Sequence, residues 1–178
     1  GEGDLVIDAT AGNGNDCLLL AQLVGSRGRV FGFDIQEEAL RNSDVLLSQA
    51  GLLGRCVLIH ASHSEMTSHL PEESNGWFSA VVFNLGYLPG GDKTITTQQD
   101  TTLTAMHQAL KLLKPDGLLC VTLYNGHPGG AEEKQALLDF GSSLSARDYH
   151  CAYLQLINQT NHPPELLLIT KKGNRTDA

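Results

Sequence analysis

The chain has 178 residues, which suits one domain with a complete hydrophobic core and leaves little room for a second. Apolar residues make up 41% of the chain and charged residues 18%, as in ordinary globular proteins, and no apolar run is long enough to span a bilayer. The formal net charge of −8 argues against a non-specific nucleic-acid coat, although it is compatible with an enzyme that contacts RNA through a local basic patch.

Apolar runs and helical patterns alternate along the chain. Strands are predicted at residues 4–9, 29–35, 55–61, 78–84 and 118–124, and helices at residues 15–24, 37–50, 101–114 and 129–144. Pro115 and Gly117 should stop the third helix, and two final strands at residues 150–158 and 165–172 have no helix between them. The chain opens almost directly on its first strand, so we expect a leading segment, with any targeting information, to be missing.

This order of elements predicts an α/β fold of the Rossmann-like type. Strands that alternate with helices form a doubly wound, mostly parallel sheet covered on both faces, here with seven strands. The last two strands lack a crossover helix, so we expect an antiparallel C-terminal hairpin at one edge of the sheet. Residues 1–172 should form this single domain, followed by a polar tail at residues 173–178.

The four cysteines indicate neither a disulfide framework nor a metal site. Cys17, Cys56, Cys120 and Cys151 lie far apart, without a C-x-x-C pair or the Cys/His spacing typical of zinc. We therefore expect reduced thiols and no metal ion.

The run "DATAGNGND" follows the first predicted strand and indicates a nucleoside-binding turn. Gly12 and Gly14 stand where the backbone must approach a ligand closely and where helix amides point outward. Asp34, twenty residues past Gly14, ends the second strand, and an acid at this place accepts hydrogen bonds from ribose hydroxyls. A tight turn and a helix-capping Asp would give the same pattern without a ligand.

The charge around this turn favours S-adenosylmethionine over a dinucleotide. The dinucleotide fingerprint asks for Gly or Ala at its third place, where this chain has Cys17. Asp8 and Asp16 would repel a pyrophosphate, whereas they would attract a cofactor that carries a sulfonium and an ammonium group. A nicotinamide-dependent oxidoreductase and a non-catalytic cofactor-binding subunit are the alternatives from other classes.

Several motifs together resemble a known enzyme family. "DATAGNGND", "VFGFDIQ" and the strand pattern are similar to class I S-adenosylmethionine-dependent methyltransferases. More narrowly, "NLGYLPGGDK", "YNGHPGG" and "NQTNHPP" resemble a bacterial and plastid family, formerly labelled putative rRNA methylase, that methylates 5-aminomethyl-2-thiouridine at the tRNA wobble position. The chain departs from the family at Asp16–Cys17, where Asp-Thr is expected, and lacks the short helical segment that usually precedes the first strand.

The resemblance implies a transferase of tRNA modification and processing. It implies RNA methylation at the exocyclic amine of the wobble uridine in the anticodon loop, with S-adenosyl-L-methionine as cofactor and a homodimer as the usual assembly. We expect a cytoplasmic protein of bacterial type without membrane contact, or a plastid protein if a leader is missing. A methyltransferase for rRNA or for a small amine is the nearest alternative within enzymes.

The loop "NLGYLPGGD" is the predicted place of methyl transfer. The amide oxygen of Asn84 can accept N–H bonds from an amine and leave the amine's lone pair facing the methyl group, while Tyr87 can stack on an extruded base. Asn84 to Tyr87 also resembles the Asn-Pro-Pro-Tyr element of amino-directed methyltransferases. A base is helpful but not obligatory, because the sulfonium charge lowers the pKa of the acceptor amine. Candidate bases are Asp92, His127 and His63.

The candidate site residues gather at the ends of the predicted strands, and each can also be read as an ordinary loop residue. The catalytic candidates are Asn84, Tyr87 and Asp92. The cofactor-binding candidates are Asp8, Ala9, Gly12, Asn13, Gly14, Asn15, Asp16, Asp34, Ile35, Gln36, Ser62, His63, Asn84 and Leu85. The substrate-binding candidates are Gly86, Tyr87, Lys93, Tyr124, His127, Gln159 and Asn161, with Lys134 as a further candidate for a phosphate contact.

Overall fold

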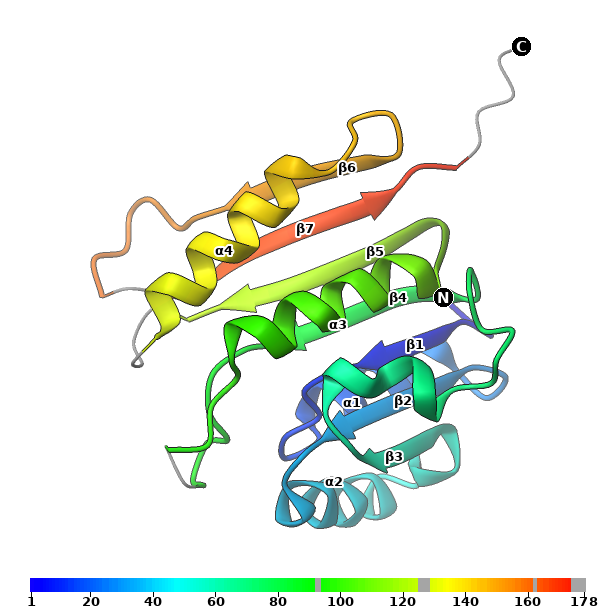
Figure 1. Ribbon diagram of the computed structural model, residues 1–178. Coiled ribbons are helices and arrows are strands. Elements are labelled where there is room, and N and C mark those ends of the chain that lie inside the picture. The colour runs from blue at the N-terminus through cyan, green and yellow to red at the C-terminus, as the bar shows by residue number, and fades with distance from the viewer. Residues whose placement is uncertain (92–93, 125–128, 162, 174–178) are drawn as a thin grey trace.

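The computed structural model describes residues 1–91, 94–124, 129–161 and 163–173 (Figure 1). The elements follow one another as β1 (Leu5–Asp8), α1 (Asn15–Val24), β2 (Arg29–Asp34), α2 (Glu37–Gln49), η1 (Leu53–Arg55), β3 (Cys56–His60), η2 (His63–His69), β4 (Phe78–Asn84), α3 (Gln99–Leu112), β5 (Leu113–Leu123), α4 (Gly130–Ser143), β6 (Tyr149–Leu154) and β7 (Glu165–Lys171). The described strands form one sheet in the order β3-β2-β1-β4-β5-β7-β6. β1 to β5 pair in parallel, and β7 pairs antiparallel with both β5 and β6, so the predicted fold class is confirmed.

Two hydrophobic cores cover the two faces of the sheet. Successive residues of a strand point to opposite faces, so Val6 of β1 packs in the core beneath α1 and α2, whereas Ile7 packs in the core beneath η2, α3 and α4. α3 and α4 lie side by side over the strands from β4 to β6 (Figure 1). Because both faces of the central strands are buried, they read as continuous apolar runs such as "AVVF" in β4.

The carboxyl ends of the parallel strands meet at one edge of the sheet, where the arrowheads of β1 to β5 end together (Figure 1). β1 lies between β2 and β4, and the chain runs from β1 outward through β2 to β3 before it returns to β4 on the other side. A crevice forms where the winding direction changes in this way, and ligands of such sheets bind there. In the described part of the chain, no helix is long and apolar enough to cross a membrane.

Three element boundaries differ from the prediction. β5 starts at Leu113, not at residue 118, because Leu113 pairs with Phe78 before a register shift accommodates the turn around Asp116, whose φ is +61°. The preceding helix correspondingly spans residues 99–112 instead of 101–114. β6 ends at Leu154 instead of residue 158, because the ladder beyond Leu166 of β7 would soon reach Pro164, which has no N–H to donate.

The connection between β3 and β4 also holds an element that was not predicted. Residues 63–69 form the 3₁₀ helix η2, in which the side chain of Ser62 accepts a hydrogen bond from the backbone N–H of Ser64 at 3.2 Å. Met66 of this segment is fully buried and packs in the same core as α3. The short polar sequence "HASHSE" has no clear helical period, so periodicity alone predicted a loop here.

Candidate active site

A cavity of about 780 Å³ opens at the carboxyl edge of the sheet. Its walls come from the ends of β1, β2, β3, β4 and β5 and from the loops that follow them. The described lining residues are Ala9, Thr10, Ala11, Gly12, Asn13, Asn15, Asp16, Phe33, Asp34, Ile35, Gln36, Ala61, Ser62, His63, Asn84, Leu85, Gly86, Tyr87, Leu88, Pro89, Gly90, Ile95, Thr96, Thr97, Gln98, Thr101 and Tyr124. This volume is in the range of small-molecule sites.

The turn between β1 and α1 is held rigidly at the floor of this cavity. Asp34 accepts hydrogen bonds from two backbone N–H groups, that of Gly12 at 2.9 Å and that of Gln36 at 2.8 Å. Each carboxylate oxygen has two acceptor positions, so both retain capacity for a ligand hydroxyl. Gly14 has a φ of +86°, and a Cβ atom there would lie 2.8 Å from the Cα of Ser43, so only glycine fits.

Asp8 lies behind the cavity wall and does not line it. Its side chain is fully buried and accepts hydrogen bonds from the backbone N–H of Thr10 and from the Cys17 thiol, both at 3.2 Å. Burial, together with the negative charges of Asp16 and Asp34, raises the pKa of Asp8 to about 7 despite the Cys17 hydrogen bond. Asp8 was predicted to bind the cofactor, but its carboxyl group does not line the cavity and instead holds the backbone of the turn from beneath.

Asn84 stands at the centre of the site with its side chain already oriented. Its backbone N–H donates to Thr10 Oγ1 at 2.7 Å, which ties the end of β4 to the end of β1. Its Nδ2 donates to Asp16 Oδ2 at 3.3 Å. Because a carboxylate can only accept, the amide nitrogen faces Asp16 and the Asn84 Oδ1 atom is left as an acceptor in the cavity.

Two partly exposed tyrosines, one after β4 and one after β5, line the cavity. Tyr87 in the β4–α3 loop (residues 85–98) is 41% exposed, and Tyr124 at the end of β5 is 39% exposed, and both line the cavity. Burial and the charge of Asp16 raise the pKa of Tyr124, so its phenol is protonated at neutral pH. Exposed aromatic rings beside a deep cavity are suited to stacking on a planar group.

The charge of the lining is negative. Asp16 and Asp34 contribute carboxylates, and neither lysine nor arginine occurs among the lining residues in the ranges that the structure describes. Cationic side chains are frequent partners of phosphate groups, and carboxylates repel them. This lining instead favours a ligand that carries positive charge.

His63 lines the cavity as a neutral ring. Burial lowers the pKa of His63 to about 4, so the imidazole carries no proton charge at pH 7. Its ring meets Phe83 edge to face, with 5.7 Å between the centroids. Its buried Nε2 atom has no hydrogen-bond partner among the described residues.

The structure brings most of the predicted residues into one cavity and leaves a few outside it. Asp8 and Gly14 support the turn from behind, while Gln159 and Asn161 lie in the β6–β7 connection at the same edge of the sheet without lining the cavity. Lys134 forms an ion pair with Glu165, and its Nζ atom lies 5.4 Å from the centroid of the Tyr153 ring. The ammonium group of Lys134 therefore already interacts with a carboxylate and an aromatic ring. Three candidates, Asp92, Lys93 and His127, fall outside the described residues.

Sequence reasoning missed the second half of the β4–α3 loop. Ile95 to Gln98 line the cavity opposite Tyr87, which forms an isolated antiparallel bridge with Thr96. The polar, threonine-rich run "TITTQQDTT" directly before a helix was the available signal, because a connection this long is often functional. Asn13 links this loop to the β1–α1 turn, since its Nδ2 donates to the carbonyl of Pro89 at 3.1 Å.

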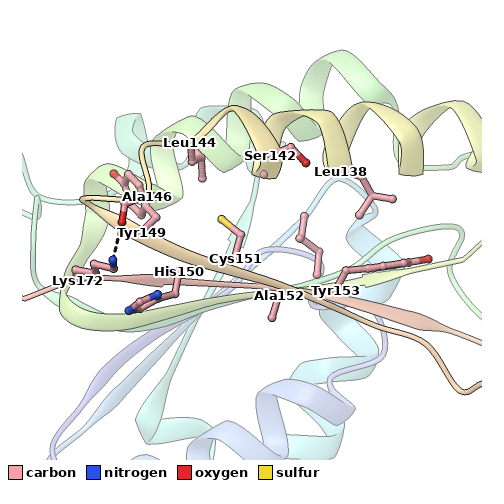
Figure 2. Close-up of a pocket in the computed structure, with 12 residues that line it drawn as sticks. Leu138, Ser142, Leu144, Ala146, Tyr149, His150, Cys151, Ala152, Tyr153 and Lys172 are labelled. Atoms are coloured by element: carbon pink, nitrogen blue, oxygen red, sulfur yellow. Dashed lines mark hydrogen bonds between the residues drawn. The ribbon is translucent and has the colours of Figure 1, made fainter.

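A second hollow, of about 490 Å³, lies between α4 and the edge strand β6 (Figure 2). Figure 2 shows Leu138 and Ser142 of α4 above the strand that carries Cys151 and Tyr153. Lys172 donates to the carbonyl of Ala146 at 2.6 Å, and no carboxylate is among the described residues around the hollow. None of the predicted site residues lies there, so the catalytic candidates belong to the larger cavity.

Comparison with known proteins identifies the family of the chain. The chain is 43% identical over 181 residues to the chloroplastic tRNA (mnm(5)s(2)U34)-methyltransferase of Arabidopsis thaliana, which covers 97% of this chain, while the chain spans 65% of the length of that relative. It superposes with a TM-score of 0.90 and 43% identity on a putative rRNA-methylase from Clostridium thermocellum, over 96% of this chain and 89% of the other.

A putative methyltransferase from Streptococcus mutans, solved in complex with SAH, superposes with a TM-score of 0.84 and 36% identity over 96% of this chain and 89% of the other. The family model described as "Putative rRNA methylase" matches residues 30–170, which run from the second residue of β2 to the last but one of β7. The resemblance found in the motifs is thus confirmed, and the chain belongs to this methyltransferase family.

Proposed function

We propose that this protein is an S-adenosylmethionine-dependent methyltransferase that methylates an exocyclic amine of tRNA. The observation that carries the proposal is Asn84 at the switch point of the sheet, held by Asp16 so that its amide oxygen faces an anionic cavity. Such a cavity suits a cationic cofactor and an amine, and it suits a dinucleotide poorly. The Streptococcus mutans relative bound to SAH supports the choice of cofactor.

Asp34 holds the ribose of the cofactor, and the β1–α1 turn around Gly12 and Gly14 holds its methionyl end. The free acceptor positions of Asp34 take ribose hydroxyls, while its bonds to Gly12 and Gln36 keep the carboxylate in place. Ser62 and His63 line the part of the cavity beyond β3, where the adenine fits against them. Asp16 attracts the ammonium group of the methionyl end, and Asp8 acts from behind by holding Thr10.

Asn84 orients the amine that receives the methyl group. When bound, the cofactor supplies an electrophilic methyl whose sulfur leaves as a neutral thioether. Asn84 Oδ1 would accept an N–H of the amine and would leave the nitrogen lone pair free to face the methyl group. Tyr87 stacks on the base that carries the amine, and Tyr124 flanks that base.

The amine must be neutral before it reacts. An alkylamine with a pKa of about 9–10 is mostly protonated at pH 7, and keeping it neutral costs roughly 3–4 kcal/mol unless its environment lowers that pKa. The positive charge of the cofactor lowers it, whereas Asp16 opposes the shift. His63 is a poor base for this step because its own pKa is about 4, so we propose that the proton leaves to solvent or to Asp92 or His127 of the neighbouring loops.

The proposed acceptor is the amine of 5-aminomethyl-2-thiouridine at the tRNA wobble position. Its support is the 43% identity, over nearly the whole chain, to a plant protein named for methylation of U34 in tRNA. The family description instead points to rRNA. The homodimer, the contacts of Lys93, Gln159 and Asn161 with the anticodon loop, and a cytoplasmic or plastid location stay predictions.

Transfer of labelled methyl groups separates these acceptors. The protein is incubated with S-[methyl-³H]adenosylmethionine and with rRNA, with free aminomethyl-uridine or with tRNA whose wobble uridine carries an unmethylated aminomethyl group. Label in RNA is counted after acid precipitation, and label in the free nucleoside is counted after chromatographic separation from the cofactor. Label in tRNA alone supports the proposal. Label in rRNA would show that rRNA is the acceptor, as the family description says, and label in the free nucleoside at an equal rate would show that a small amine is sufficient as acceptor. A parallel titration should detect binding of S-adenosylmethionine and none of NAD.

A further inference from the structure

Glu133 is a buried carboxylate near the start of α4 that the site described above does not use. Its side chain is 3% exposed and lies between two threonine hydroxyls. Thr97 Oγ1 donates to Glu133 Oε2 at 3.0 Å, and Thr102 Oγ1 donates to Glu133 Oε1 at 2.7 Å. A buried carboxylate is costly unless its hydrogen bonds are made, so both threonines matter to it.

Thr97 connects this carboxylate to the loop that carries the acceptor residues. Its hydroxyl, while donating to Glu133, accepts a hydrogen bond from the backbone N–H of Gly86 at 3.0 Å, and its own backbone N–H donates to the carbonyl of Gly86 at 3.0 Å. Because Glu133 takes the hydroxyl hydrogen, the lone pairs of Thr97 Oγ1 are turned toward Gly86. The two ends of the β4–α3 loop are thereby closed onto each other.

The closed loop starts two residues after Asn84. Gly86, Tyr87 and Thr97 all line the cavity, whereas Glu133 does not, so Glu133 can reach the reaction only through the loop. A well-packed apolar side chain would serve stability at least as well as a buried charge, and a buried polar network is better explained by the single geometry that it specifies. Thr102 belongs to α3, and its hydroxyl donates to Glu133 and not to the β4–α3 loop.

We propose that Glu133 is a positioning residue of the transferase, which acts through Thr97 to hold the β4–α3 loop against the amine-bearing base. The inference rests on the proposed function, because the loop is assigned there to the acceptor. It predicts that the hydrogen bond from Thr97 to Glu133 matters for turnover and that the bond from Thr102 to the same carboxylate matters for stability alone.

Thr97→Val and Thr102→Val form a matched pair that tests this difference. Each removes one hydroxyl donor from Glu133 without a large change in volume, and Thr102 is the more deeply buried of the two. We expect Thr97→Val to lower kcat for tRNA at least tenfold with an unchanged Kd for S-adenosylmethionine, and Thr102→Val to lower it less than threefold despite an equal or larger loss of Tm. Thr97→Ser, which keeps the hydroxyl, should recover most of the lost turnover.

Amide hydrogen exchange gives a readout that does not depend on turnover. The amides of Gly86 and Thr97 should exchange at least tenfold faster in Thr97→Val than in the wild-type chain, and they should be unchanged in Thr102→Val. Turnover that follows Tm across the three variants, or equal exchange in both valine variants, would overturn the inference. A wild-type chain inactive on tRNA, but with the expected exchange pattern, would refute the proposed function and leave the positioning network standing.

Discussion

Replacement of Asn84 by alanine should separate cofactor binding from methyl transfer. The substitution removes the Oδ1 acceptor and the 3.3 Å bond from Nδ2 to Asp16, and it keeps the backbone bond to Thr10. Asn84 is exposed, so the lost hydrogen bond should cost less than about 1 kcal/mol of stability. Losing the group that orients the reacting amine should cost roughly 3–4 kcal/mol of transition-state stabilisation, or about 10²–10³-fold in kcat.

The assay compares two constants for the same variant. Isothermal titration gives the Kd of S-adenosylmethionine, and single-turnover methylation of tRNA gives the rate of transfer. Asn75→Ala is the matched control, because Asn75 is an exposed asparagine in the turn before β4, away from the cavity. It should change neither constant.

An equal loss of affinity and turnover in Asn84→Ala would refute the assigned role. That result would mean that Asn84 holds the cofactor, or the turn between β1 and β4, and does not orient the acceptor. A turnover within threefold of the wild-type value would refute it as well.

Three further substitutions test the floor of the cavity. Gly14→Ala should lower stability by more than Gly51→Ala does. Both glycines have a positive φ, which costs alanine about 1–2 kcal/mol of strain, but only at Gly14 would the new Cβ clash with the backbone of Ser43. Equal losses of Tm in the two variants would contradict this. The pKa of Asp8 is raised from 3.8 to about 7, so its contribution to stability is fully present below about pH 4 and is lost as pH rises through 7, by up to about 4 kcal/mol. Asp8→Asn should therefore gain Tm relative to the wild-type chain as pH rises from about 4 to about 7, and a constant difference would argue against the buried acid. Asp34→Asn should weaken binding of S-adenosylmethionine about 10–100-fold in a titration, because a charge-assisted acceptor is lost. An unchanged Kd would mean that Asp34 does not bind the ribose.

Much of the fold was predictable because the local sequence patterns agree with the overall arrangement of the sheet. The apolar run before Asn84 and the missing helix before Glu165 each determined one feature of the sheet. The boundary errors at β5, at the helix before it and at β6 arose where pairing with a neighbouring strand decides where a strand begins or ends. Such pairing depends on residues far away in the sequence, so no local pattern carries it.

The candidate site was predictable in its centre and less so at its periphery. Strand ends such as Asp34 and Asn84 could be placed, because the carboxyl edge of a doubly wound sheet collects them. Asp8 was assigned to the cofactor because its charge is visible in the sequence, whereas its burial is not. The link from Glu133 through Thr97 to the acceptor loop joins segments more than thirty residues apart, and only the packing of α4 against α3 brings them together.

Mass spectrometry of nucleosides tests the central claim most directly. Transfer RNA that carries 5-aminomethyl-2-thiouridine is incubated with the protein and S-adenosylmethionine, digested to nucleosides and analysed beside a reaction without cofactor. The account predicts that this nucleoside alone gains the mass of one methyl group, on the exocyclic amine. An unchanged nucleoside in a reaction where S-adenosylmethionine is bound, or a methyl group on any other nucleoside, would contradict it.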